Sequence, residues 1–145
     1  MTQYIRVRNE ESEQEIVIRW ARMSSGKYPA LKLLHHIPNG GSRNKREAAK
    51  LKRMGVLAGV SDLHLPVPAA GYHGLYIEMK CDDGRLSPSQ KIFLKLAAHY
   101  NNYCAVCYMA EDAINIIEDY VNQLKPFEHE NLIIMKGGKI IGKVN

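Results

Sequence analysis

The sequence predicts an α/β domain in which a mixed β-sheet is covered by helices. Its 145 residues match the size of one ordinary domain. The chain is 46% hydrophobic and 24% charged, as in an average soluble globular protein. Segments with helical periodicity alternate with short apolar runs of strand length, which is typical of an α/β fold. We expect one domain over residues 1–145, with its core at about 11–124 and a C-terminal hairpin at about 131–142.

Four segments have the apolar spacing of a helix. In the first, Ile16, Trp20 and Met23 share one face. The second mixes apolar and basic residues, which predicts one apolar and one cationic face. The third begins with Ser87 as a cap and Pro88 at the first helical position. The predicted helices are residues 11–23, 42–54, 88–100 and 110–124.

Strands are predicted at four short apolar runs, three of which are bounded by Pro or Gly. These are residues 31–37, 60–67, 75–81 and 103–109. In the third run, the two-residue period places Tyr76, Glu78 and Lys80 on one face. Residues 132–141 form two apolar arms around a Lys-Gly-Gly-Lys turn, which predicts a hairpin. Such a hairpin is too small to be stable alone, so we expect it to dock on its own domain or on a partner subunit.

Composition argues against membrane and secreted classes. No apolar run approaches the length of a spanning helix, and the N-terminal residues are too polar for a signal peptide. The three cysteines form no disulfide framework. We therefore expect a cytoplasmic protein, and we interpret Cys104 and Cys107 as core residues, since their strand offers no second pair of zinc ligands.

Positive charge is concentrated in one segment. The formal net charge is +5 and the pI about 9.1. Residues 42–53 carry a single acid, Glu47, against six basic residues: Arg43, Lys45, Arg46, Lys50, Lys52 and Arg53. This bias predicts phosphate binding. The preceding Pro-Asn-Gly-Gly turn at residues 38–41 either cradles a phosphate or is a plain turn before a solvated helix; the sequence leaves both open.

Asp62 and Glu78 are the strongest candidates for chemistry. They lie on two strands joined by a Pro/Gly-rich turn, and paired carboxylates of this kind suit Mg²⁺ or Mn²⁺. Lys80, on the face of Glu78, is placed to orient or deprotonate a water, or to stabilise charge on a phosphate. The alternative is an ordinary Glu-Lys ion pair. A second candidate is the pair of consecutive histidines, His35 and His36. They are interpreted as core or edge histidines, because the rest of a His-Asn-His nuclease motif is missing.

Several motifs in order resemble a known nuclease family. The stretch G-V-S-D-L at residues 59–63, followed by I-E-M-K at 77–80, resembles the PD-(D/E)XK signature, with Ser61 in place of its proline. I-P-N-G-G at residues 37–41, the stretch 43–59 and G-R-L-S-P-S-Q at 84–90 resemble the virus-type replication-repair nuclease (VRR-NUC) family in particular. The resemblance runs from about residue 11 to 121.

The resemblance implies a restriction-endonuclease-like core and a Mg²⁺- or Mn²⁺-dependent endodeoxyribonuclease. Its metal ligands would be Asp62, Glu78 and the backbone carbonyl of Met79. On the first helix Glu11 fits the family best, Glu15 is the fallback, and Glu13 stays open. The implied catalytic set is Glu11, Asp62, Glu78, Lys80 and Gln90, and the implied DNA-binding set is Asn39, Arg43, Lys45, Arg46, Lys50, Arg53 and Ser87.

The same resemblance suggests a substrate. Stand-alone members similar to this chain are small and often phage-encoded, which would place the protein in a bacterial host cell. The family is linked to DNA repair and to branched DNA such as four-way (Holliday) junctions, whose symmetric cleavage calls for a homodimer. Alternatives are a flap or sequence-specific endonuclease, a non-catalytic DNA-binding module, or an interaction domain in which Glu78 and Lys80 form only a salt bridge.

Overall fold

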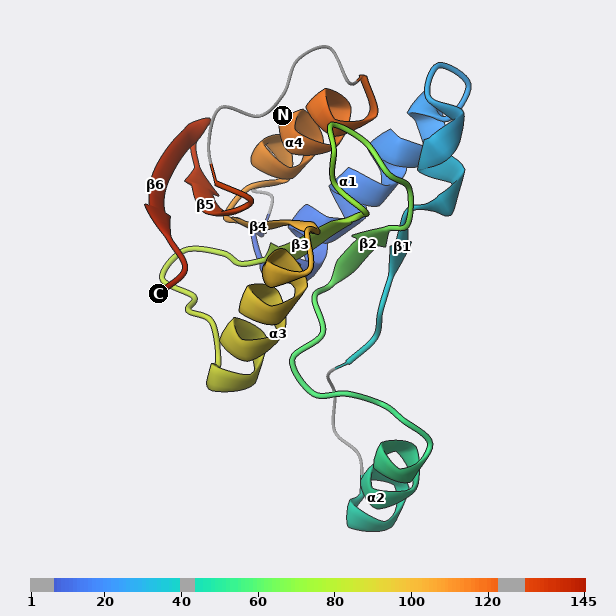
Figure 1. The fold of residues 1–145 in the computed structure, drawn as a ribbon, viewed down its shortest axis with the longest axis vertical. Helices are drawn as coiled ribbons and strands as arrows, with labels where there is room; N and C mark the ends of the chain where they lie inside the picture. Colours follow the sequence, from blue (N-terminus) through green and yellow to red (C-terminus); the bar gives the residue numbers. More distant parts are fainter. Residues whose placement is uncertain (1–6, 40–43, 123–129) are drawn as a thin grey trace, which may run out of the picture.

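The computed structural model describes residues 7–39, 44–122 and 130–145 (Figure 1). Helices and strands alternate along the chain, as the sequence predicted. The elements are α1 (Glu10–Ser24), the 3-10 helix η1 (Pro29–Leu33), β1 (His35–His36), α2 (Lys45–Arg53), β2 (Leu63–Leu65), β3 (Leu75–Met79), α3 (Pro88–His99), β4 (Tyr103–Cys107), α4 (Ala110–Asn122), β5 (Leu132–Lys136) and β6 (Lys139–Lys143). Among these residues no helix is long and apolar enough to cross a membrane.

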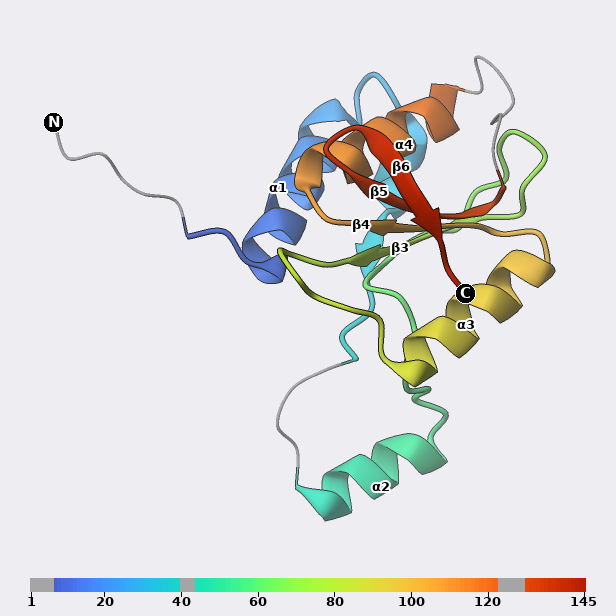
Figure 2. The ribbon, with the colours of Figure 1, turned by 90° about the vertical axis from the view of Figure 1, so that its left-hand side faces the viewer.

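The six strands form one mixed sheet in the order β1-β2-β3-β4-β5-β6. Strands β1, β2 and β3 pair antiparallel, β3, β4 and β5 pair parallel, and β6 returns antiparallel to β5. The two parallel connections contain α3 and α4. Figure 2 shows α3 on one side of the sheet and α1 with α4 on the other, so the central strands are covered on both faces, as parallel strands require.

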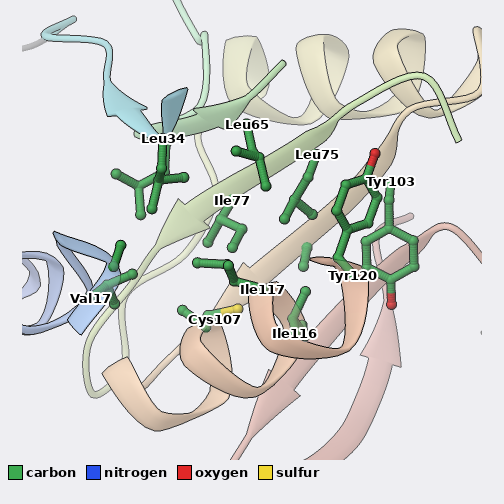
Figure 3. Close-up of a cluster of buried hydrophobic side chains, with 14 of the residues drawn as sticks. Val17, Leu34, Leu65, Leu75, Ile77, Tyr103, Cys107, Ile116, Ile117 and Tyr120 are labelled. Carbon is green, nitrogen blue, oxygen red and sulfur yellow. The ribbon is translucent and has the colours of Figure 1, made fainter. Parts of the chain in front are cut away.

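The larger core lies between the sheet and the pair α1 and α4 (Figure 3). Leu75, Ile77 and Met79 of β3 are buried in it because alternate strand residues face the same side. From the helices, Val17 and Ile117 complete the contact. This packing fixes β3 as the rigid centre of the molecule.

A smaller core lies under α3. Leu94 packs there against Cys104 and Val106 of β4, with Tyr76 of β3 partly buried beside them. Both Cys104 and Cys107 are buried, so the interpretation of these cysteines as core residues is confirmed. Tyr76 and Glu78 alternate along β3 with the residues of the larger core, so both face α3.

The predicted strand at residues 31–37 was largely wrong. Pro29 begins a 3-10 helix instead, and only His35 and His36 form a strand. Leu31 and Leu34 are both buried, and their spacing of three places them on one side of a 3-10 turn. The predicted strand at residues 60–67 is also shorter than expected, since only Leu63–Leu65 pair as β2.

Helix α2 projects from the body of the molecule (Figures 1 and 2). It is shorter than the predicted residues 42–54, because Asn44 caps it by accepting a hydrogen bond from the N–H of Glu47 at 2.8 Å. None of its residues is buried. Its apolar face is therefore not covered by the described parts of the chain.

The C-terminal hairpin docks on its own sheet, one of the two outcomes predicted. Strand β5 pairs with β4, and Cys104 lies beside Leu132. Asp112 at the start of α4 is buried and accepts hydrogen bonds from the N–H groups of Gly137 and Gly138 at 3.0 and 2.6 Å. Both glycines have positive φ, which the tight turn requires.

Candidate functional site

One open cleft of about 790 Å³ gathers four of the five predicted catalytic residues, Glu11, Asp62, Glu78 and Gln90. Its walls come from α1, from the chain around β1 and β2, from β3 and from the start of α3. The residues that line it are Glu10, Glu11, Gln14, Glu15, His36, Pro38, Asn39, Ala58, Gly59, Val60, Asp62, Glu78, Ser87, Ser89 and Gln90.

Asp62 and Glu78 come together as the sequence predicted. Leu63 pairs with Ile77, so extending this register by one residue sets Asp62 opposite Glu78. The carboxylate Oδ2 of Asp62 accepts a hydrogen bond from the backbone N–H of Met79 at 2.8 Å. This bond ties Asp62 to the rigid strand β3, although Asp62 itself precedes β2.

The Glu78 carboxylate is buried and only half satisfied. Its side chain is 3% exposed. Oε1 accepts a hydrogen bond from Nε2 of Gln90 at 2.9 Å and lies 3.6 Å from Nζ of Lys80. Oε2 is buried and has no hydrogen-bond partner among the described residues. A buried acceptor left in this way is costly unless something else contacts it.

Burial also governs the protonation of Glu78. Removal from water raises its pKa, the neighbouring Asp62 charge raises it further, and the Lys80 ammonium opposes both. The net result is a pKa of about 8. In the metal-free protein Glu78 is therefore largely protonated at neutral pH, and a cation next to it would favour its ionised form.

Gln90 is fixed by the start of α3. Its Oε1 accepts from the N–H of Ser87 at 2.9 Å, while the hydroxyl of Ser87 accepts from the N–H of Gln90 at 3.3 Å, so the two residues form a capping box. The remaining amide N–H of Gln90 points to Glu78. One side chain therefore both caps a helix and orients a carboxylate.

Gly59 lets the opposite wall approach α3 closely. Its φ is +89°, and a Cβ placed on it would lie 2.3 Å from the backbone oxygen of Ser89. Only glycine fits both the conformation and the contact. The loop before β2 is therefore held against the start of α3, beside Gln90.

Of the acids predicted on the first helix, Glu11 and Glu15 line the cleft, and they lie one turn apart. Glu13 lies elsewhere and is 4% exposed. It contacts Arg8 at 2.9 Å and accepts a hydrogen bond from the N–H of Ala110 at 2.8 Å. Glu13 thus anchors α1 to the start of α4 and does not line the cleft. Glu10, not predicted, also lines the cleft.

His36 is the clearest site residue that the sequence analysis missed. It is exposed on the edge strand β1, so its interpretation as a core or edge histidine was right in position, but it also lines the cleft. Its Nδ1 lies 2.7 Å from the backbone oxygen of Asp62. Neither motif nor spacing indicated this contact, because it depends on the pairing of β1 with β2.

The predicted DNA-binding residues fall into two groups. Asn39 and Ser87 line the cleft, and Asn39 donates a hydrogen bond to the backbone oxygen of Leu57 at 2.9 Å, which joins the two segments that lead to α2. Arg43 lies outside the described residues. The remaining members are on the projecting helix, and all are exposed: Lys45, Arg46, Lys50 and Arg53.

The described residues contain no group of three or more His, Cys, Asp or Glu side chains arranged to hold a metal. Asp62 and Glu78 form a pair, and the buried, unpartnered oxygen of Glu78 is available to a hard cation. The side chain of Met79 is buried in the core, so only its backbone carbonyl could serve as a ligand, as predicted. The donor set present fits Mg²⁺ or Mn²⁺ with water and substrate oxygens completing the shell.

Comparison with known proteins identifies the family and the fold. The model of the VRR-NUC domain family matches residues 8–111. A solved structure described as a VRR_NUC domain protein is 29% identical with a TM-score of 0.70, over 86% of this chain and 98% of that chain. No curated protein matches the chain. The predicted family resemblance and the restriction-endonuclease-like α/β fold are thereby confirmed. The chain belongs to the VRR-NUC domain family, nucleases of the PD-(D/E)XK type.

Proposed function

We propose that this protein is a metal-dependent endonuclease that hydrolyses phosphodiester bonds in DNA. The observation that supports this most directly is the buried Glu78 carboxylate, which faces Asp62 at the base of the cleft with one oxygen unpartnered. A purely structural ion pair with Lys80 would not leave a buried acceptor unsatisfied.

Asp62, Glu78 and the backbone carbonyl of Met79 would hold Mg²⁺ or Mn²⁺. Nucleases of this superfamily typically use divalent metals. When bound, the metal supplies Lewis acidity and lowers the pKa of a water in the site. The chain must then keep both carboxylates ionised, and the ammonium of Lys80, 3.6 Å from Glu78 Oε1, lowers the Glu78 pKa in that direction.

The remaining residues have roles that follow from their positions. Lys80 is 8% exposed, so its ammonium is held in one place and can orient the attacking water or stabilise charge on the phosphate. Gln90 holds the Glu78 carboxylate in a fixed orientation through the start of α3. Glu11, with Glu15 as the alternative, would accept a hydrogen bond from water opposite the strand carboxylates.

The projecting helix would supply the electrostatic contact with DNA. Its cationic side chains are exposed and can neutralise backbone phosphates without reading sequence. Asn39 and Ala58, on the two segments that lead to α2, line the cleft. A strand held on α2 would thus pass close to Asp62 and Glu78.

Within this proposal, branched DNA, a four-way junction above all, is the preferred substrate class. Symmetric cleavage of a junction calls for two active sites related by a two-fold axis, hence a homodimer. Just after α2 lie three exposed apolar residues, Met54, Val56 and Leu57. A second subunit of the homodimer would cover them. Flap cleavage is the competing activity.

The test is cleavage of labelled four-way junction, flap and linear duplex DNA in Mg²⁺ and in Mn²⁺. Lys80→Ala is compared with the wild type, and Lys27→Ala, an exposed lysine outside the cleft, serves as the control. Paired symmetric cuts in the junction that are lost in Lys80→Ala support the full proposal. If only flaps are cut, the protein is a nuclease whose substrate is the flap and not the junction. DNA binding without any cut in either metal would overturn the proposal.

A further inference from the structure

A row of three aromatic rings crosses the sheet next to the cleft. His35 pairs with His64, and His64 pairs with Tyr76, so the three residues share one register on β1, β2 and β3. The rings of His64 and Tyr76 are stacked, with centroids 4.2 Å apart and planes 3° apart. The His35 ring meets His64 edge-on at 5.3 Å.

This row lies on the same face as the two carboxylates. His64 is two residues after Asp62 and Tyr76 is two residues before Glu78, and a strand repeats its facing direction every two residues. Both rings are only partly buried, whereas His35 is exposed. An aromatic surface therefore begins two residues along the strands from Asp62 and Glu78 and continues to His35 on the edge strand β1.

Helix α3 extends this surface. Its Phe93 contacts Tyr76 edge-on, with centroids 5.1 Å apart. Ile92, Leu96 and Tyr100 recur every four residues and are 68%, 56% and 67% exposed, so they form one apolar stripe. We call these residues, with Tyr76 and His64, the α3 ledge. Because Ser89 and Gln90 at the start of α3 line the cleft, the ledge begins next to the site, and its residues Ile92 to Tyr100 extend about 12 Å along the helix axis.

The charge beside the ledge selects an anionic partner. Residues 88–100 contain no acid. Lys91, Lys95 and His99 are exposed and recur at the same four-residue spacing, beside the apolar stripe. A second copy packed on this face would bring like charges together, whereas a phosphate backbone would pair with them.

An apolar stripe beside cations suits unpaired nucleotides better than duplex. In a duplex the base faces are stacked inside and only their edges are accessible in the grooves. Unpaired nucleotides present a phosphate backbone together with free base faces, which stack on aromatic and apolar side chains. The α3 ledge, with its exposed apolar stripe and the neighbouring lysines, offers both kinds of contact.

Building on the nuclease function proposed above, we propose that the α3 ledge binds unpaired DNA nucleotides next to the phosphate that is cut. The bases pack on Leu96, Tyr100 and their apolar neighbours, and the backbone lies along Lys91 and Lys95. The enzyme then prefers DNA with unpaired nucleotides at the branch, such as a fork or an opened junction, over intact duplex.

The experiment measures DNA binding by the full chain in EDTA, where no cutting occurs. Fluorescence anisotropy compares a forked DNA carrying unpaired 2-aminopurine with a duplex of the same length. The variants are Leu96→Ala and Tyr100→Ala, both at exposed positions; Tyr100→Phe keeps the ring, and Met23→Ala, 80% exposed on α1, is the matched control.

The proposal predicts that each ledge variant loses about five- to a hundredfold in affinity for the fork, with a clearly smaller loss on the duplex. Tyr100→Phe and Met23→Ala retain fork affinity. Quenching of 2-aminopurine on binding is weakened by Tyr100→Ala. Equal losses on fork and duplex, or no loss on either, would overturn it.

Two further outcomes separate this proposal from the nuclease itself. If the wild type binds forks through the ledge but cuts no DNA in Mn²⁺, the nuclease fails and the ledge stands. If it cuts DNA and the ledge variants keep the wild-type ratio of fork to duplex binding, the ledge fails and the nuclease stands. A wild type that is dimeric in sedimentation equilibrium, with Leu96→Ala monomeric, would assign the ledge to a second copy and overturn the proposal.

Discussion

The side-chain amide of Gln90 donates a hydrogen bond to Glu78 Oε1 at 2.9 Å, which links the start of α3 directly to the central strand β3. The other end of the same amide closes the capping box with Ser87. Orientation of the candidate metal ligand and stability of the helix therefore depend on one residue.

Gln90→Ala should reduce both properties. Loss of the capping box and of the bond to Glu78 is expected to lower the free energy of unfolding by about 1–2 kcal/mol. Denaturant unfolding measures this effect, and calorimetry with Mn²⁺ should show weaker binding, because the carboxylate is no longer held. Lys91→Ala, on the next residue, is the control. Unchanged Mn²⁺ affinity in Gln90→Ala would show that Gln90 does not orient Glu78.

Glu78→Gln should alter the pH dependence of stability in the metal-free protein. The wild-type carboxyl ionises at its ordinary pKa when unfolded and at about 8 when folded. The stability tied to its neutral form is full below the unfolded pKa and is lost as pH rises through about 8. At pH 8.5 in EDTA, Glu78→Gln should therefore be more stable than wild type, by on the order of 2 kcal/mol.

Unfolding of both proteins at pH 5 and pH 8.5 checks this prediction, with the exposed Asp83→Asn as the control. The difference between wild type and Glu78→Gln should be small at pH 5 and large at pH 8.5. The same difference at both pH values would contradict a raised Glu78 pKa.

Glu13→Gln should reduce stability, whereas Glu11→Gln should reduce cleavage. Glu13 is buried between Arg8 and the start of α4, so its substitution should destabilise the fold by about 1–3 kcal/mol. Glu11 is exposed in the cleft, so its substitution should leave stability nearly unchanged and reduce cleavage. Thermal unfolding and Mn²⁺-dependent cleavage are measured on both. If Glu11→Gln cleaves normally, Glu15→Gln becomes the decisive variant.

Gly59→Ala should distort the cleft, and Gly55→Ala provides a matched comparison. Both glycines have positive φ, but a Cβ at Gly59 meets the backbone of Ser89 at 2.3 Å, whereas nothing lies within 4 Å of one at Gly55. We expect Gly59→Ala to cost on the order of 3 kcal/mol and Gly55→Ala about 1 kcal/mol. Urea unfolding of the two variants tests this, and equal costs would mean that the contact with Ser89 is unimportant.

Removing one phosphate contact from α2 should weaken DNA binding without sequence preference. Lys50→Ala is expected to reduce the magnitude of the slope of log K against log salt by about 0.9 on duplex. Binding titrations over a range of NaCl measure this slope, and Lys27→Ala, near η1, is the control. An unchanged slope would remove Lys50 from the DNA contact.

The sequence predicted the elements that depend on local patterns. The helix at residues 88–100 matched α3 almost residue for residue because Ser87 and Pro88 mark its start. The strand at residues 75–81 was right because its two-residue alternation places Glu78 opposite the core side chains. The prediction failed at residues 31–37 because Leu31 and Leu34 are compatible with either a strand or a 3-10 turn. Pro29 at the first position of the 3-10 helix favours the turn.

The candidate site residues were predicted from sequence motifs, but the role of Glu13 and the contact of His36 with Asp62 were not. Asp62 and Glu78 were identified because they lie on two predicted strands joined by a turn, and Gln90 because the stretch at residues 84–90 resembles the family. The role of Glu13 could not be assigned, because its partners Arg8 and Ala110 depend on how α1 packs on α4. His36 was missed for the same reason, since its contact with Asp62 exists only once β1 pairs with β2.

The most direct test of the proposed nuclease is DNA cleavage in Mn²⁺ by the wild type and by Glu78→Gln. This substitution keeps the shape and the partners of the side chain and removes its charge, and Asp83→Asn removes an exposed charge outside the cleft. We expect cleavage by the wild type and by Asp83→Asn, and a loss of at least about a hundredfold in Glu78→Gln. Cleavage by Glu78→Gln at the wild-type rate would show that the Asp62 and Glu78 pair is not the catalytic centre.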